Sequence, residues 1–376
     1  QYTSQPEVWK AAEEEIGSHP STLRLIVPEA FLEEAEERSR DACRKMAEYL
    51  EQGLFAPLQD SFVLVERSTQ SGRRVGLVLA VDLEDYDYQP GSASLIRATE
   101  ETVLARIPPR LKLREESLLE LSHVLLLIND PGDSLLGPLY RKRQSLPAVY
   151  DTPLLMKGGH IRGWQVADAA DQARLMETLR SLKEQLGSNG LLFAVGDGNH
   201  SLAAAKAAWE KQKAGLTARQ RQEHPMRYAL AELVNLHSPA LLFEPIHRMA
   251  FGTNRQRMLE ALSLLEPVRD EEAPDIVLTG EEGDLPLALR AAKGRLLTQA
   301  VQQLLDEAGF PLDYVHGSEA LREIAAARGG TGILMPDFPK EQLFPAVRRD
   351  GRLPRKTFSM GEANEKRFYL EIRRIK

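Results

Sequence analysis

The sequence has one cysteine, no excess of basic residues and no long apolar runs, and each of these absences argues against a class of protein. Its single cysteine, Cys43, cannot form a disulfide within the chain, which favours a reducing compartment such as the cytoplasm. No apolar run approaches the ~20 residues of a membrane-spanning helix, and no signal peptide is visible. The formal net charge is −7, whereas a dedicated nucleic-acid surface is normally basic. We therefore expect neither a membrane nor a nucleic-acid partner.

Several catalytic signatures are also missing from the 376 residues. There is no Gly-x-x-x-x-Gly-Lys-Ser/Thr loop, which excludes a P-loop enzyme, and no Gly-x-Gly-x-x-Gly after a first strand, which argues against a Rossmann dehydrogenase. Neither Cys-x-x-Cys nor His-Glu-x-x-His occurs, so zinc is not expected. Cys43 carries no signature of a nucleophile. The ordinary composition, 43% hydrophobic and 27% charged, fits a globular protein of one large or two ordinary domains.

The most informative stretch joins two halves with opposite patterns. Residues 191–195 are apolar without a break, which is the pattern of a strand buried on both faces. From Leu202 onward the sequence is rich in alanine and predicts a helix. Between them, residues 196–201 read Gly-Asp-Gly-Asn-His-Ser, with two glycines for a sharp turn. The stretch therefore predicts a strand, a tight turn and a helix start.

The predicted helix start is a natural place for an anion. Its first backbone N–H groups have no partner within the helix, and the helix dipole is positive there. Asp197 can cap the helix, and His200 and Ser201 can direct donors at a bound anion. A capped turn without any ligand explains the same residues, and the two interpretations stay open on this motif alone.

An acidic segment follows the alternating apolar strand predicted at residues 73–82. Four carboxylates lie within six residues, and such hard oxygen ligands could hold Mg²⁺ beside a substrate phosphate; the alternative is a solvated charged loop. A helix predicted at residues 94–105 would then bring Arg97 near Glu100. The four carboxylates are Asp82, Glu84, Asp85 and Asp87.

Strands and helices alternate around these motifs, which predicts an α+β (mixed α/β) fold. A boundary near residues 251 and 252 would divide an N-terminal α+β domain, 1–251, from a smaller α+β lobe, 252–376. Further expected elements are a strand at 21–27, a helix at 29–52, a hairpin of 61–66 with 73–82, a strand at 124–128, a hairpin of 148–154 with 160–166, a helix at 168–186, a strand at 226–236 with 240–243 beside it, and a closing hairpin of 356–360 with 367–372.

Four short motifs, in order along the chain, resemble those of one family. Residues 84–86 (Glu-Asp-Tyr), Pro90-Gly91 and 96–102 resemble its Glu-Asp-Tyr, Pro-Gly and His-Glu-x-Thr segment, and residues 197–201 resemble its Asp-Gly-His-His-Arg signature. Residues 243–248 are similar to its Leu-Pro-Thr-His-Arg element, and residues 353–358 to its Met-Pro-Gln-Lys-Ser-Thr ending. On these residues the chain resembles the family known as domain of unknown function 1015, which is similar to the ParB and sulfiredoxin superfamily and its free-serine kinases.

The resemblance implies a ParB/sulfiredoxin-like core that binds nucleotide or phosphate. It also implies a small-molecule phosphotransferase that uses ATP, ADP or pyrophosphate with Mg²⁺ to phosphorylate a hydroxyl substrate, with serine as a candidate. The chain departs from the family's pattern where Asn199 replaces a His, Ser201 replaces an Arg, and Ala98 or Thr99 stands in place of a His. In the family an initial strand with an acidic residue would come just before Gln1, so we expect part of a site to precede it.

A second hypothesis is a non-catalytic nucleotide- or metabolite-binding regulatory protein. Ser201 in place of Arg favours this hypothesis, whereas the acidic segment favours an enzyme. The net charge disfavours a DNA-binding function.

The resemblance also implies roles for individual residues. The expected catalytic residues are Asp197, His200 and Glu100; the expected phosphate-binding residues are Gly198, Asn199, His200, Ser201, Arg97, His247, Arg248, Lys356 and Thr357; and the expected metal ligands are Asp85 and Glu84.

Overall fold

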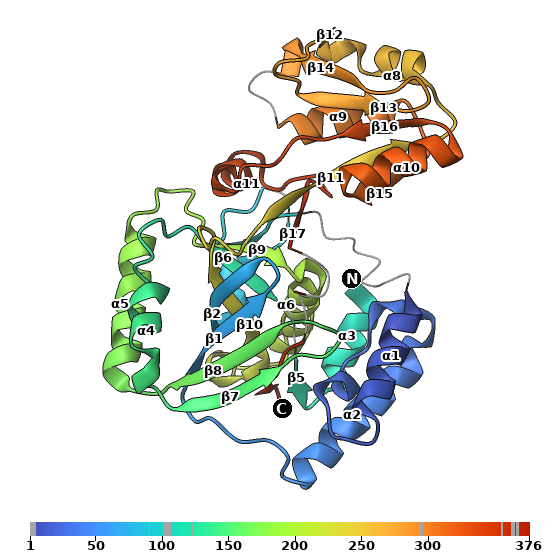
Figure 1. Cartoon of the computed structure of the whole chain (residues 1–376). Helices are drawn as coiled ribbons and strands as arrows, with labels where there is room; N and C mark the ends of the chain where they lie inside the picture. Colours follow the sequence, from blue (N-terminus) through green and yellow to red (C-terminus); the bar gives the residue numbers. More distant parts are fainter. Residues whose placement is uncertain are drawn as a thin grey trace. The chain divides into compact units, whose positions relative to one another are not determined.

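The computed structural model describes residues 5–89, 91–100, 107–121, 124–292, 296–354, 356–361, 365 and 368–376. The chain forms two compact units. Unit 1 comprises Gln1–Leu241 together with Gly361–Lys376, and unit 2 comprises Leu242–Met360. Each unit combines helices with a sheet, which confirms the expected α+β class (Figure 1).

A nine-stranded mixed sheet forms the centre of unit 1, in the order β3-β4-β9-β6-β10-β2-β1-β8-β7. The predicted hairpins β1/β2 and β7/β8 are confirmed as antiparallel pairs. At the other side of the sheet β3, β4 and β9 pair in parallel, so their carboxyl ends lie along one edge. The strands are β1 (Phe62–Thr69), β2 (Gly72–Asp82), β3 (Tyr86–Asp87), β4 (Ile96–Ala98), β6 (Leu125–Ile128), β7 (Ala148–Pro153), β8 (His160–Val166), β9 (Phe193–Asp197) and β10 (Tyr228–Asn235).

Both faces of the central strands are buried. In β2 the consecutive residues Leu77, Val78 and Leu79 are all buried, although the alternating sequence predicted one buried face. Leu77 and Leu79 pack into the largest apolar cluster of the unit, whereas Val78 packs with Phe368 and Leu370 on the opposite face. The second face is covered because residues near the carboxyl terminus return to it.

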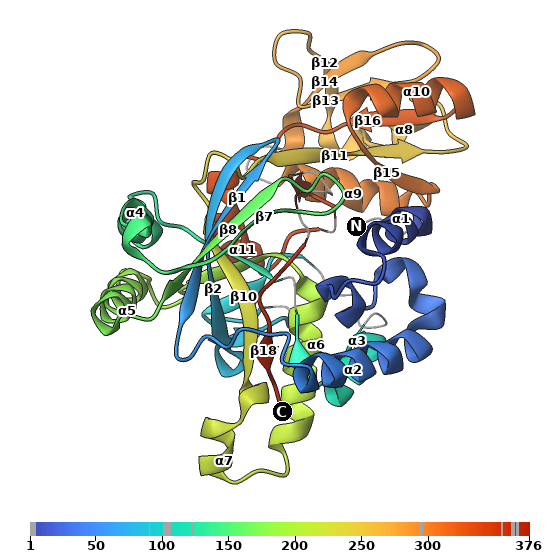
Figure 2. The same cartoon turned by 60° about the horizontal axis from the view of Figure 1, so that its bottom comes forward.

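Helices lie on both sides of this sheet. Figures 1 and 2 show α1, α2 and α3 on one side and α4 and α5 on the other. None of the helices among the described residues is long and apolar enough to cross a membrane. The helices of unit 1 are α1 (Pro6–Ile16), α2 (Ala35–Glu51), α3 (Ile107–Glu116), α4 (Leu136–Arg141), α5 (Ala169–Glu184), α6 (Asn199–Lys213) and α7 (Ala218–Glu223).

Two local predictions in unit 1 are wrong. The strand expected at 21–27 is a short 3-10 helix, Thr22–Leu25. The Ser21 side chain caps its start by accepting a hydrogen bond from the Leu23 amide. The helix expected at 94–105 is instead strand β4 over residues 96–98, and residues 101–106 lie outside the described part of the chain. Ile96 and Ala98 are buried between the neighbouring strands β3 and β9, and this tertiary pairing outweighs the local helical pattern.

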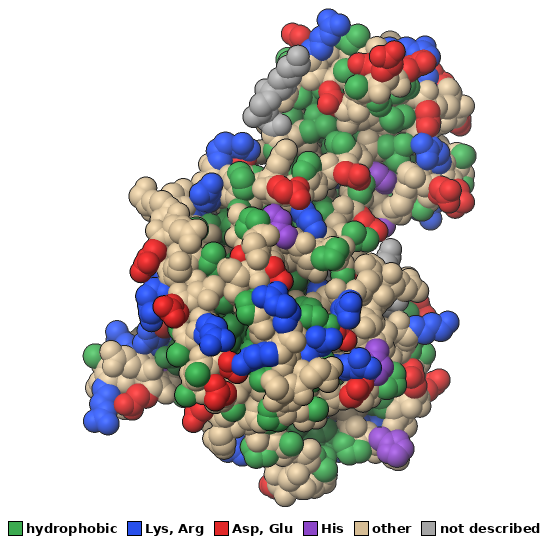
Figure 3. Space-filling view, turned by 60° about the vertical axis from the view of Figure 1, so that its left-hand side comes forward, with side chains coloured by type: hydrophobic (Ala, Val, Ile, Leu, Met, Phe, Trp, Pro, Cys, Tyr) green, Lys and Arg blue, Asp and Glu red, His purple; other side chains and the backbone are tan. Residues whose placement is uncertain are grey.

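Charged side chains of both signs are interspersed on the face of the molecule in Figure 3. In unit 1 Arg162 pairs with Asp151 across β7 and β8, with 3.1 Å between Nε and Oδ2. Arg73 pairs more loosely with Glu66, at 3.9 Å. These surface arginines therefore have carboxylate partners.

Unit 2 is built on its own sheet, in the order β12-β14-β13-β16-β11-β15, with β17 paired to β11. Its core includes a stack of Phe243, Phe338 and Phe358, in which the Phe243 and Phe358 ring centroids are 4.1 Å apart. The strands are β11 (Phe243–Ala250), β12 (Pro267–Arg269), β13 (Ile276–Thr279), β14 (Leu285–Leu289), β15 (Leu312–His316), β16 (Thr331–Leu334) and β17 (Phe358–Met360), and the helices are α8 (Arg255–Ala261), α9 (Leu297–Glu307), α10 (Ser318–Arg328) and α11 (Leu343–Asp350).

The division of the chain differs from the one expected at 251 and 252. Unit 2 begins ten residues earlier, because all of β11 pairs with strands of that unit. The expected closing hairpin is wrong: β17 pairs with β11, whereas β18 (Arg373–Arg374) pairs with β5 (Leu119–Glu120) in unit 1. Residues 240–243 likewise do not pair with β10, because Phe243 already belongs to β11.

The returning carboxyl-terminal segment is tied to unit 1 by polar contacts. Glu365 accepts hydrogen bonds from the amide and the hydroxyl of Ser71, at 2.8 and 2.9 Å. The Arg373 guanidinium donates to Glu120 and to the carbonyls of Pro225 and Tyr228. Since Glu120 is almost fully buried, Arg373 and Arg114, which also donates to it, neutralise a carboxylate that water cannot reach.

Arg373→Ala should therefore lower the free energy of unfolding of unit 1 by about 2–3 kcal/mol, because it removes hydrogen bonds to a buried carboxylate and to two carbonyls. Arg374→Ala is the matched control, since Arg374 is exposed. Urea unfolding followed by tryptophan fluorescence measures this unit alone, because Trp9, Trp164 and Trp209 are the three tryptophans of the chain and all lie in unit 1. Equal effects of the two substitutions would contradict the role assigned to Arg373.

Candidate functional site

The predicted strand, turn and helix start are present in unit 1. Strand β9 ends at Asp197, and α6 begins at Asn199. Gly198 between them is the N-cap and has a φ of +85°, a left-handed conformation that favours glycine. The Asp197 Oδ1 atom accepts a hydrogen bond from the Gly198 amide at 2.7 Å. The N-cap has no side chain to accept from the amides of the first turn, so the helix start is not capped by its own residue.

Strand β4 brings a second carboxylate to the same edge of the sheet. Ala98 pairs in parallel with Val195, so Glu100 and Asp197, each two residues further along, follow neighbouring strands to one edge. Thr99 reinforces this pairing, since its hydroxyl donates a 2.7 Å hydrogen bond to the carbonyl of Val195. Both Glu100 and Asp197 therefore belong to the candidate site.

The Arg97 side chain is directed to the other end of β9. Its guanidinium donates to the carbonyls of Ser94, Asn189 and Gly190, at 2.8, 3.1 and 2.8 Å, and the side chain is buried. Residues 189 and 190 precede β9, whereas Asp197 ends it. The structure thus gives Arg97 a role in fixing the loop before β9, in place of the phosphate contact expected beside Asp197.

Asn199, His200 and Ser201 form the first turn of α6 and are all partly exposed. Within the described residues, the Asn199 Oδ1 atom is shielded from solvent and has no hydrogen-bond partner. The rest of α6 is held firmly, because Leu202, Ala203, Ala204 and Ala205 are all buried. A fixed helix therefore presents its amide end beside Asp197.

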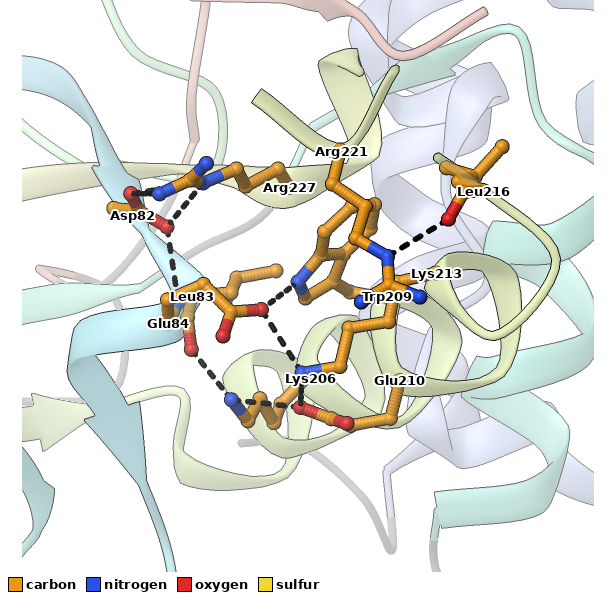
Figure 4. Close-up of polar contacts among 10 residues, drawn as sticks. All are labelled: Asp82, Leu83, Glu84, Lys206, Trp209, Glu210, Lys213, Leu216, Arg221 and Arg227. Carbon is orange, nitrogen blue, oxygen red and sulfur yellow. Dashed lines mark hydrogen bonds and ion pairs between the residues drawn. The ribbon is translucent and has the colours of Figure 1, made fainter. Parts of the chain in front are cut away.

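The acidic segment meets the opposite end of α6 (Figure 4). Glu84 accepts hydrogen bonds from the Trp209 indole and from Lys213, the latter at 3.0 Å. Lys206 donates to the carbonyl of Leu83 at 2.8 Å. Trp209 and Lys213 lie roughly 14 Å and 20 Å further along the helix axis than His200, so Glu84 is bound far from the first turn of α6.

Asp82 and Asp85, two other acids of this segment, differ in their surroundings. Asp82 forms a bidentate pair with Arg227, whose Nε atom lies 3.0 Å from Oδ1 and whose Nη2 atom lies 2.6 Å from Oδ2. Asp85 is exposed. Among the residues that the structure describes, no group of three or more His, Cys, Asp or Glu side chains is arranged to hold a metal ion. Glu84 already pairs with Lys213 and accepts a hydrogen bond from the Trp209 indole, and the expected Mg²⁺ site at Glu84 and Asp85 stays a prediction.

This network predicts a specific pH dependence. Partial burial alone would raise the pKa of Glu84, but hydrogen bonds from Trp209 and Lys213 and the charges of Lys213 and Lys206 outweigh it and lower the pKa. The folded state thus releases this proton more readily than the unfolded state, so the stabilisation is complete above the ordinary pKa and is lost as the pH falls through the folded-state value.

Glu84→Gln should lower the free energy of unfolding of unit 1 by about 0.2–1 kcal/mol at pH 7, the range for a largely exposed ion pair. The difference from the unmodified protein should shrink as the pH falls below 4.5. Asp85→Asn, at an exposed neighbour, should have a smaller effect. Urea unfolding at several pH values measures both, and repeating it with Mg²⁺ tests the metal assignment. A Mg²⁺-dependent stabilisation that Glu84→Gln abolishes would confirm Glu84 as a ligand.

A buried group of charges was missed in the sequence. Glu232 in β10 lies within 4 Å of two buried guanidinium groups, those of Arg67 and Arg74. Glu232 and Asp197 are both register partners of Leu125, which places them on the two strands that flank β6. The one signal in the sequence is Glu232 itself, the single charge in the otherwise apolar run 229–234.

The remaining expected site residues belong to unit 2. His247 is buried, and its Nδ1 atom accepts a 3.1 Å hydrogen bond from the Met335 amide, which leaves its proton on Nε2. Burial, followed by the charge of Arg248, lowers the pKa of His247. Arg248 is fully buried, donates to Gln302 at 3.2 Å, and its pKa is lowered to about 10 by burial.

The last family motif lies beside the third. Phe358 pairs with Pro245, so the segments 243–248 and 353–358 are neighbours in unit 2, which their separation in sequence did not reveal. Lys356 is exposed with a φ of +61°, and the Thr357 hydroxyl donates to the carbonyl of Pro354 at 2.8 Å. Pro90 and Arg355 of the family motifs lie outside the described residues.

Comparisons with known proteins identify similar sequences and structures. A family model described as "Protein of unknown function (DUF1015)" matches residues 1–308. No curated protein matches the sequence. A free serine kinase in complex with AMP is similar at a TM-score of 0.41 and 16% identity, over 76% of this chain and 87% of that one. A conserved hypothetical protein from Pyrococcus furiosus is similar at 0.38 and 14% (76% and 91%), and SbnI from Staphylococcus aureus, truncated at its C-terminus, at 0.41 and 10% (76% and 83%).

Proposed function

This chain belongs to the DUF1015 family of proteins of unknown function, and we propose that it is a phosphotransferase that phosphorylates the hydroxyl group of a small molecule. The observation that supports this function is the turn between β9 and α6. There a left-handed Gly198 connects a carboxylate, Asp197, to the amide end of a buried helix. Phosphoryl transfer depends mainly on positioning and charge neutralisation, which a fixed helix start supplies.

The donor phosphate binds at the first turn of α6. The amides of Asn199 and His200 cradle its oxygens, and the absence of a side chain at Gly198, whose own amide donates to Asp197, permits a close approach of the backbone. His200 neutralises developing charge, and Ser201 donates from its hydroxyl. The resemblance of residues 197–201 to the family signature, and the family's similarity to free-serine kinases, support a nucleotide or pyrophosphate as the donor.

Glu100 is the base in this proposal. It accepts the proton of the substrate hydroxyl while that oxygen forms a bond to the terminal phosphorus of the donor. The bond from this phosphorus to the bridging oxygen breaks, and the shortened donor leaves with the bonding electrons. Asp197 on the neighbouring strand orients the turn. Mg²⁺ is expected to enter bound to the donor phosphates.

A second function is supported by a specific observation. Ser201 occupies the position of the family's arginine, and the Arg97 guanidinium is bound to backbone carbonyls at the other end of β9. A protein that binds a nucleotide or another anionic metabolite without transferring phosphate needs the helix start but fewer cations. Both functions require binding at α6, and only the first requires turnover.

Substitutions in the turn test the proposal. Asp197→Ala should lower kcat about 10²-fold or more, because it disorders the groups that face the developing charge, whereas His200→Ala should weaken donor binding more modestly, since the amides remain. Ser201→Arg should strengthen the binding of ATP, ADP or pyrophosphate. Phosphorus NMR with a panel of hydroxy amino acids and small alcohols measures transfer, and calorimetry measures donor binding.

His19→Ala is the control for these variants, because His19 is an exposed histidine of the same unit. Donor binding without transfer in every combination would favour the regulatory protein. If Asp197→Ala and His200→Ala leave both binding and transfer unchanged in folded protein, residues 197–201 are only a helix start and the proposed site is wrong.

A further inference from the structure

The hairpin β1/β2 carries two buried arginines that share one carboxylate. Arg67 and Arg74 are register partners on this hairpin. The Glu232 Oε2 atom lies 3.8 Å from the Arg67 Nε atom and 3.5 Å from the Arg74 Nη2 atom. Both distances allow an ion pair but exceed those of a strong charge-assisted hydrogen bond. Two guanidinium groups therefore share Glu232, while Glu371, a second carboxylate, lies close enough to Arg67 to interact with it electrostatically.

The two guanidinium groups differ in how they are satisfied. Arg67 donates to the carbonyl of Phe368 at 3.0 Å and stacks on the Tyr369 ring, with 4.4 Å from its guanidinium carbon to the ring centroid. For Arg74 the Nε and Nη2 atoms are shielded from solvent and have no hydrogen-bond partner in the described part of the chain. Buried donors are normally paired, and an unmade hydrogen bond is destabilising.

The Arg74 side chain is less enclosed than that of Arg67. It is 9% exposed, whereas the Arg67 side chain is 1% exposed. Arg74 is therefore nine-tenths buried, and its Nε and Nη2 atoms lie in the shielded part of the side chain. Its neighbour in sequence provides a contrast, because Arg73 is 60% exposed and lies beside Glu66, at 3.9 Å. Of these two adjacent arginines, only Arg74 combines burial with unmade hydrogen bonds.

The position of Arg74 relates it to the candidate site. Its partner Glu232 and the site residue Asp197 both pair with Leu125, so they lie about 10 Å apart, two strand spacings, on the same sheet. Tyr369 also lies close enough to interact electrostatically with Arg74, Glu232 and Asp197. Gly76 leaves room for this arrangement, because a Cβ atom at that position would overlap the Glu232 carboxylate.

We propose that Arg74 is the recognition residue of an oxyanion subsite in unit 1 that takes a carboxylate or a phosphate group. The planar guanidinium presents parallel N–H donors that match both kinds of anion. The assignment of this anion to the substrate or the donor rests on the proposed function, in which α6 holds the transferring phosphate and Arg74 holds a second anionic group. The binding of an oxyanion at Arg74 does not depend on transfer.

The subsite is tested by NMR of protein labelled with ¹⁵N in arginine, titrated separately with inorganic phosphate and with acetate. We expect one Nε–H resonance, absent from Arg74→Gln, to shift with saturation in at least one titration. The anion that saturates at lower concentration identifies the subsite as one for phosphate or for carboxylate. Arg74→Gln should weaken binding about tenfold or more, the effect of removing a charge-assisted hydrogen bond.

Arg73→Gln is the matched control and should leave both the resonance and its titration unchanged. Arg74→Lys keeps the charge while it loses the planar donors, and should bind intermediately; it also serves if Arg74→Gln is not folded by the tryptophan unfolding assay. The proposal is overturned if neither anion shifts the Arg74 resonance in the unmodified protein, or if Arg74→Lys and Arg74→Gln bind the anions as tightly as Arg73→Gln.

Failure of the subsite and failure of the proposed function give different results. If the Arg74 resonance responds to anions while no phosphate transfer is detected, the subsite stands and the phosphotransferase assignment fails. If transfer depends on Asp197 while the Arg74 resonance does not respond, the function stands and the subsite is wrong. A response that persists in His200→Ala shows that Arg74 binds its anion independently of the helix start.

Discussion

The packing of the unit 1 sheet around strand β10 depends on how the Glu232 carboxylate is neutralised. A carboxylate in the middle of a nine-stranded sheet, almost fully buried, would be strongly destabilising without positive partners. Arg67 and Arg74 supply them from the adjoining hairpin, and Gly76 leaves the space that this packing needs. The backbone at Phe368 and the ring of Tyr369 then cover Arg67. The carboxyl-terminal segment must therefore return to unit 1, although all of unit 2 separates it from the rest of that unit.

Local sequence predicted the parts of the fold that are determined locally. The apolar run at 193–195, the glycine at 198 and the alanines after 202 specify β9, a left-handed turn and α6 without any distant partner. The hairpin β1/β2 was predictable for the same reason. The short strand β4 was not, because Ile96 and Ala98 become a strand only through pairing with β3 and β9. The partners of β17 and β18 are more than a hundred residues away in sequence, and no local pattern indicates them.

The candidate site shows the same division between local and distant information. Residues 197–201 stand at the end of a strand as their order predicts. The acidic segment did not reveal the partners of Glu84, because Trp209 and Lys213 come from the far end of α6. Arg97 was expected beside Glu100, but a strand directs its side chain along a different course from a helix, toward the carbonyls of 189 and 190. The family motifs could not show which side chains already have partners within the fold.

Helix α6 links these findings, because it is fixed along its whole length. Its alanines permit close packing, with Ala203 and Ala204 against Ile107 of α3, and Glu84 and the carbonyl of Leu83 hold its later turns. These contacts support the position of its first turn beside Asp197, and groups that need no reorganisation bind developing charge most effectively. The substitutions that separate this chain from its family, Asn199 and Ser201, change side chains at that turn and leave the backbone amides in place. The site should thus keep its affinity for an anion while its selectivity depends on the side chains around it.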